Sequence, residues 1–94
     1  MTLFKEAKKE EVKITVERLK NKVYVVIAQK GNITKEAIWI MPKKTQMDEF
    51  EYRIQMVALE ISSKGIEITE QQVLDVIKKN AHKLYIHLPK KEET

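Results

Sequence analysis

The sequence predicts an α+β protein in which an antiparallel sheet of three or four strands carries two helices packed on one face. Two observations predict this class. Residues 12–41 contain three segments with the alternation or the β-branched residues of strands, and residues 45–82 contain two segments with apolar residues at helical spacing. A last alternating segment at 84–88 gives the order β-β-β-α-α-β, and a meander with helices on one face is an α+β layout.

The 94 residues are enough for one domain, which we expect to span residues 11–89. Residues 1–10 are expected to form a flexible or partly helical N-terminal arm, because an isolated helix of that length is marginal in water. The charged residues 90–94 are expected to form a disordered tail.

Turn residues separate the three leading strands. Over residues 12–17 apolar and polar side chains alternate, which is typical of a half-buried strand. Asn21 is the expected positive-φ residue of the first turn. Residues 23–28 are apolar on both faces, which indicates a central strand. A third strand is expected over residues 33–41, where Pro42 ends it.

Residues 45–65 carry the pattern of a long helix. Thr45 is the expected N-cap, and Gly65 is the expected C-terminal stop. The apolar residues recur at spacings of three and four, so they form one seam along the helix. This seam consists of Met47, Phe50, Ile54, Val57 and Ile61.

A second helix is expected over residues 70–82. Thr69 and Gln72 have the spacing of a capping box. The five-residue link at 65–69 is longer than the turn of three or four residues in a DNA-reading helix-turn-helix. The two helices are therefore interpreted as an ordinary αα-hairpin that packs on the sheet.

Charge is unevenly distributed along the chain, whose net charge is +4. Residues 1–44 carry 11 basic and 5 acidic side chains, whereas residues 45–75 carry 2 basic and 7 acidic ones. Residues 76–94 are basic again, with 5 basic and 2 acidic side chains. The folded chain should therefore have one surface that attracts a polyanion and one that repels it.

Several classes of function are disfavoured. The chain has no cysteine, which excludes disulfides and thiolate metal sites. His82 and His87 lack carboxylates at metal-ligand spacing, so no metal and no cofactor is expected. No residues assemble a general acid, a base and an oxyanion site, so an enzyme is not expected. The sequence contains no run of 18 apolar residues and no signal-peptide pattern, and we expect a cytoplasmic protein.

The sheet face turned away from the helices is the expected binding site. If Ile38 and Ile40 face the helices, the opposite face presents aromatic residues between lysines. Aromatic rings can stack unpaired bases while lysines hold phosphates. We therefore expect a non-enzymatic accessory protein that binds single-stranded DNA or RNA, or nucleic-acid shape, without sequence specificity. The expected contact residues are Lys13, Lys35, Trp39, Lys43, Lys44, Tyr85 and His87.

A protein interface is the alternative interpretation. The same apolar surface, including Trp39 and Met41, could pack against a partner or against a second copy of the chain, because so short a chain has a small core. The acidic face around Glu49, Glu51 and Glu60 is a further candidate contact. The chain would then be a small subunit of a nucleic-acid-processing complex or a homodimeric adaptor. Phosphate contacts weaken steeply with salt and an apolar interface does not, so salt distinguishes the two.

Overall fold

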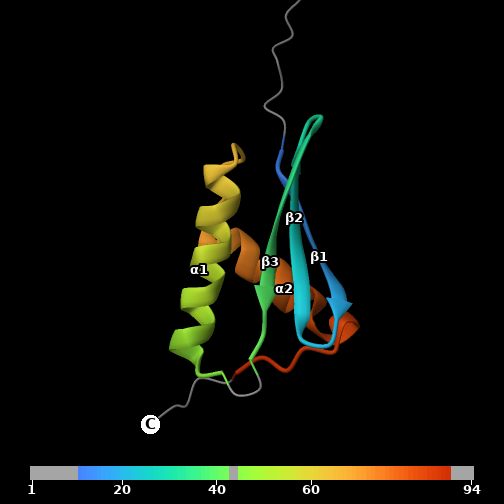
Figure 1. The fold of residues 1–94 in the computed structure, drawn as a ribbon, viewed down its shortest axis with the longest axis vertical. Coiled ribbons are helices and arrows are strands. Elements are labelled where there is room, and N and C mark those ends of the chain that lie inside the picture. Colours follow the sequence, from blue (N-terminus) through green and yellow to red (C-terminus); the bar gives the residue numbers. More distant parts are fainter. Residues whose placement is uncertain (1–10, 43–44, 90–94) are drawn as a thin grey trace, which may run out of the picture.

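The computed structural model describes residues 11–42 and 45–89 and confirms the α+β class (Figure 1). The expected arm at 1–10, the expected tail at 90–94 and the predicted contact residues Lys43 and Lys44 lie outside the described residues. The elements in chain order are β1 (Lys13–Lys20), β2 (Val23–Lys30), β3 (Ile33–Ile40), α1 (Met47–Ser63) and α2 (Glu70–Leu84).

The three strands form an antiparallel meander in the order β1-β2-β3. Two-residue turns join them, and their backbones use the left-handed region at Lys22 (φ 65°) and Gly31 (φ 62°). The expectation that Asn21 holds this conformation in the first turn is wrong by one residue. The register of β1 against β2 shifts between Arg18 and Lys20, where β1 carries a bulge.

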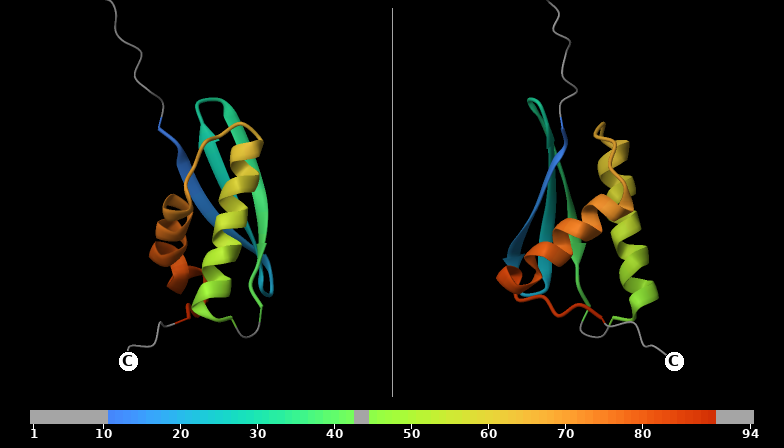
Figure 2. Two further views of the ribbon diagram at one scale, coloured as in Figure 1. Left: turned by 90° about the vertical axis from the view of Figure 1, so that its left-hand side faces the viewer. Right: turned by 180° about the vertical axis from the view of Figure 1, so that it is seen from behind.

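Both helices cover the same face of the sheet (Figure 2). α1 packs against β3, α2 packs against β1, and the helices contact each other. The predicted seam of α1 faces inward, because Phe50, Ile54, Val57 and Ile61 are all buried. These contacts place one apolar core between the sheet and the helix pair.

The helix boundaries confirm the second predicted cap and correct the first. In α2 the Gln72 backbone N–H donates to Thr69 Oγ1 (3.2 Å), and the Thr69 N–H donates to Gln72 Oε1 (2.8 Å), which completes the capping box. Gln46, not Thr45, is the N-cap of α1, and it makes no side-chain cap bond. Thr45 Oγ1 instead donates to the Pro42 carbonyl (3.4 Å).

The predicted strand at 84–88 does not form. Leu84 ends α2, and Tyr85 follows with a left-handed backbone (φ 58°) as its C-cap. The Ile86 N–H then donates to the Ala81 carbonyl (2.9 Å), the bond that closes a Schellman motif. Ile77, Ala81 and Leu84 share one helix face at spacings of four and three, so helical burial of Leu84 prevails over the alternation that follows it.

The predicted orientation of β3 is also wrong. Trp39 pairs with Tyr24 and Ala37 pairs with Val26, and all four side chains are buried on the helix side. Ile38, expected to face the helices, is 60% exposed instead. Ile40 follows it on the uncovered face at 55% exposure. The large indole fills space between the sheet and α1 that an isoleucine could not fill.

Candidate functional site

The structure divides the predicted contact residues among three places. Lys13 pairs with Gln29 and Lys35 pairs with Ala28, which puts both lysines near the β2–β3 turn. Tyr85 and His87 lie together at the opposite end, and Trp39 is 1% exposed in the core. The predicted stacking platform on one sheet face is therefore not formed, because Trp39 points to the helices and the fourth strand is absent from the described residues.

The uncovered sheet face is apolar rather than aromatic. Val25 and Ile38 form a cross-strand pair on this face, where Val25 is 4% exposed although no helix covers it. Charged side chains surround the pair, including Glu17 opposite Val25 and Glu36 one pair further along. No aromatic ring on this face could receive a base, since the described strands place Tyr24 and Trp39 on the other one.

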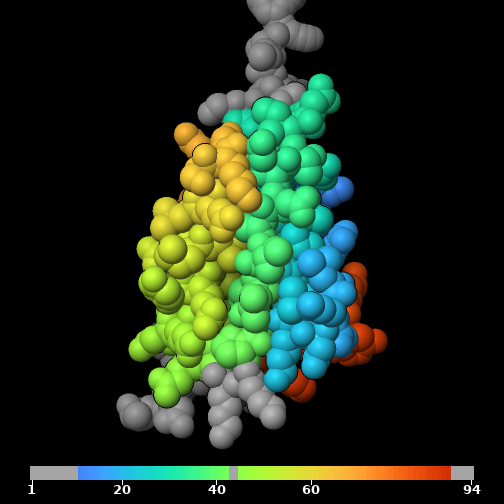
Figure 3. Space-filling view, viewed as in Figure 1, coloured from blue at the N-terminus to red at the C-terminus, as the bar shows by residue number. Residues whose placement is uncertain are grey.

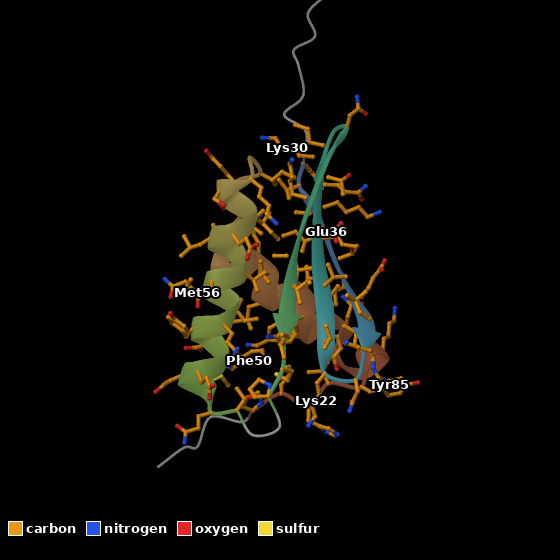
Figure 4. The ribbon with its side chains drawn as sticks, in the orientation of Figure 1. Lys22, Lys30, Glu36, Phe50, Met56 and Tyr85 are labelled. Carbon is orange, nitrogen blue, oxygen red and sulfur yellow. The ribbon has the colours of Figure 1, made fainter. Side chains whose placement is uncertain are left out.

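The aromatic and basic side chains gather instead in a cleft at one end of the sheet. This basic cleft has a volume of about 350 Å³ and contains no acidic side chain among the described residues that line it. Figure 4 shows Tyr85 and Lys22 at this end of the molecule, with Lys30 at the other. The residues that line the cleft are Arg18, Asn21, Lys22, Tyr24, Met41, Pro42, Tyr85, Ile86 and His87.

Local backbone geometry positions the side chains of the basic cleft. Arg18 precedes the β1 bulge, and Lys22 holds the left-handed position of the β1–β2 turn. Tyr85 holds the left-handed C-cap of α2. The Tyr24 hydroxyl donates to the Leu84 carbonyl (3.4 Å) and so fixes the end of α2 against β2. Two separate turns thus bring their side chains to one place.

Tyr85 and Arg18 make the central contact of this cleft. Arg18 Cζ lies 5.9 Å from the centre of the Tyr85 ring, within the range of a cation–π contact. Tyr85 is nonetheless 77% exposed, so most of its ring remains open to a ligand. Lys22 and His87 supply further nitrogen donors along the same cleft. This arrangement suits an anionic ligand that also carries a flat ring.

The described lining of the cleft contains no carboxylate and no serine, threonine or cysteine. Across residues 11–42 and 45–89, no three His, Asp or Glu side chains are grouped so that they could hold a metal ion. Nor does either helix of this part of the chain have the length and apolar character that a bilayer span requires.

A second surface lies along the seam where β3 meets α1 (Figure 3). Four large apolar side chains are between 45% and 60% exposed there, and a cavity of about 290 Å³ separates the strand from the helix. We call this the edge surface. It is formed by Ile38, Ile40, Tyr52 and Met56.

The α1 residues of the edge surface are not among the predicted contact residues. Tyr52 and Met56 are spaced by four, which places them on one side of the helix, away from the buried seam. That apolar pair is visible in the sequence. Two residues of the predicted acidic face, Glu49 and Glu60, line the cavity beside it.

Comparison with known proteins finds no family model, no curated protein and no solved structure that matches this chain. Any functional proposal must therefore start from the basic cleft and the edge surface themselves.

Proposed function

We propose that this chain is a non-enzymatic protein that binds single-stranded nucleic acid, DNA or RNA, through the basic cleft. The observation that carries the proposal is the contact between Arg18 and the exposed ring of Tyr85 in a cleft whose described lining has no acidic residue. A base stacks on the Tyr85 ring, while Arg18, Lys22 and His87 contact the phosphates. These are the two components of single-strand binding.

The shape of the site favours a single strand over a duplex. A base must leave its stack to lie flat on Tyr85, and in a single strand this costs less than in a duplex. The first turn of α2, the part that a helix-turn-helix protein would place against base edges in the major groove, carries Glu70, Gln71 and Gln72 and no basic side chain. The binding is therefore independent of sequence, because ring stacking accepts every base.

The test is fluorescence anisotropy of a labelled mixed-sequence single-stranded oligonucleotide, titrated at several salt concentrations. Tyr85→Ala should weaken binding roughly fivefold to 150-fold, because one stacked base is worth about 1–3 kcal/mol. Tyr52→Ala is the matched control, since Tyr52 is a similarly exposed tyrosine on the edge surface. Equal affinities of the wild type, Tyr85→Ala and Tyr52→Ala would contradict the proposal.

Salt dependence tests the phosphate contacts separately. Arg18→Ala should lower the slope of log affinity against log salt by about 0.7, because each phosphate that a protein neutralises on a single strand adds that much to the slope. Lys13→Ala, a lysine at the far end of β1, should leave the slope unchanged. If Lys13→Ala changes the slope and Arg18→Ala does not, the nucleic acid lies on the uncovered sheet face and not in the cleft.

A further inference from the structure

β3 is an edge strand whose outward backbone groups can be identified. The Met41 N–H donates to the Lys22 carbonyl (2.9 Å), so residues at odd positions of β3 face β2. Residues at even positions face outward, and the bond from Lys64 Nζ to the Glu36 carbonyl (2.7 Å) agrees with this parity. Ile38 and Ile40 thus turn their N–H and C=O groups outward. No described side chain hydrogen-bonds to either of them.

The edge surface continues from this strand onto α1. The cavity between the two is lined by Ile38 and Ile40 on one side and by Tyr52 and Met56 on the other. Exposed large apolar side chains beside an unpaired strand edge are the combination that favours addition of another strand.

We propose that a second copy of the chain docks on the edge surface and that the two β3 strands pair antiparallel about a two-fold axis at Ile38. This pairing joins the two three-stranded sheets into one of six strands. Ile38 pairs with Ile38 of the second copy, and Glu36 pairs with Ile40 of the second copy. All are outward-facing positions, so each pair exchanges two backbone hydrogen bonds once the Glu36 carbonyl turns from Lys64 Nζ to the N–H of Ile40 of the second copy.

The charges on α1 fit the same two-fold axis. The α1 helices of the two copies lie on one face of the joined sheet and run antiparallel to each other. With the axis between Met56 and Val57, Arg53 meets Glu60 of the second copy, and Glu49 meets Lys64 of the second copy. Within each chain, Arg53 already pairs with Glu49 (3.2 Å) and Lys64 with Glu60 (3.3 Å). The proposed contact would therefore link the ion pairs within each chain to those between the chains, in one network in which positive and negative side chains alternate.

The strand axis and the helix axis lie on the same part of the edge surface. Ile38 lines the cavity that includes Arg53, Met56 and Glu60, and it also lines the neighbouring cavity with Glu60 and Lys64. Ile38 therefore lies beside the segment of α1 that carries the charge pattern. In the proposed contact, a single two-fold rotation forms both the backbone hydrogen bonds between the strands and the ion pairs between the helices, as in an isologous dimer.

The test is sedimentation equilibrium of the wild type and of two charge-reversed variants. The wild type should be a dimer. Arg53→Glu and Glu60→Arg should each weaken the dimer at least about tenfold, because each places like charges together twice in the symmetric contact. An equal mixture of the two variants should form a heterodimer. In one of its two contacts both residues are substituted, so the opposite charges are exchanged but still attract. In the other contact the original Arg53 and Glu60 meet unchanged.

Matched controls separate this contact from general charge effects. Lys78→Glu makes the same charge change as Arg53→Glu, and Glu67→Arg makes the same change as Glu60→Arg, both at exposed positions away from the edge surface. These two variants should remain dimers. A monomeric wild type would overturn the proposal and leave the edge surface to an unrelated protein. Variants that fold, as judged by circular dichroism, and yet fail to form the heterodimer would also overturn it.

Discussion

Tyr24 and Trp39 lie opposite each other on adjacent strands, with ring centres 5.4 Å apart and planes inclined by 38°. Phe50 of α1 continues the cluster, its ring centre 5.7 Å from that of Trp39 in an edge-to-face arrangement. This aromatic cluster connects the sheet to α1. It therefore supports the fold, whereas the exposed aromatic ring of the basic cleft is that of Tyr85.

Substitution of Trp39 should affect stability and not binding. Trp39→Ala should lower the free energy of unfolding by about 3–5 kcal/mol, the usual cost of removing a buried aromatic side chain. Trp39→Phe should cost less, because the buried indole Nε1 has no hydrogen-bond partner among the described residues that the variant would remove. Urea unfolding measures both costs. If Trp39→Phe loses oligonucleotide affinity while it remains folded, the placement of Trp39 outside the site is wrong.

Tyr85 should show the opposite behaviour. Its left-handed backbone (φ 58°) is unfavourable for a residue with a side chain, so Tyr85→Gly should raise the free energy of unfolding by about 1 kcal/mol. The same variant should bind oligonucleotide as weakly as Tyr85→Ala. Thermal unfolding and anisotropy on one preparation give both values. A destabilised Tyr85→Gly would indicate that the tyrosine ring supports the fold.

The two predicted N-caps should differ in their contribution to stability. Thr69→Ala removes the capping box of α2 and should cost about 1 kcal/mol. Thr45→Ala removes only the bond to the Pro42 carbonyl outside α1, so it should cost less. Urea unfolding of the two variants compares them directly. Equal costs would place Thr45 at the cap of α1 after all.

Gly65 should resist substitution for a backbone reason alone. Its φ of 113° is a conformation that side chains disfavour, although a Cβ built there would meet no described atom within 4 Å. Gly65→Ala should therefore destabilise the chain by about 1–2 kcal/mol without disturbing the packing around it. Unfolding measurements give the cost. An unchanged stability would mean that the link between α1 and α2 relaxes to another conformation.

The sequence predicts the elements of this fold better than their orientation. The α1 seam and the α2 capping box follow from spacing, because their residues interact within a few positions along the chain. The face of β3 does not follow from spacing. Ile38 and Ile40 are as apolar as Ala37 and Trp39, so alternation is equally consistent with either face. The choice depends on the space between the sheet and α1, which is a property of the packed structure.

The candidate site is only partly predictable for the same reason. Tyr85 and His87 are among the predicted contact residues, and the structure brings them together. Arg18 and Lys22 join them through the β1 bulge and a left-handed turn. The turn is predicted from the sequence, although at Asn21 in place of Lys22, whereas the bulge has no clear signal there. The expected strand at 84–88 places Tyr85 on a sheet face, whereas the Schellman motif places it at the end of the sheet.

The bulge between Arg18 and Lys20 bears on how large an assembly of these chains can grow. A three-stranded sheet has two edges, and the proposed contact uses only β3. If β1 were equally receptive, each dimer could recruit another and the chains would form filaments. The bulge interrupts the regular ladder of β1, and the charged residues on either side of it, Glu17, Arg18 and Lys20, discourage a further strand. In the proposed dimer the two outer β1 edges would therefore not accept further strands, and the assembly would stop at two copies.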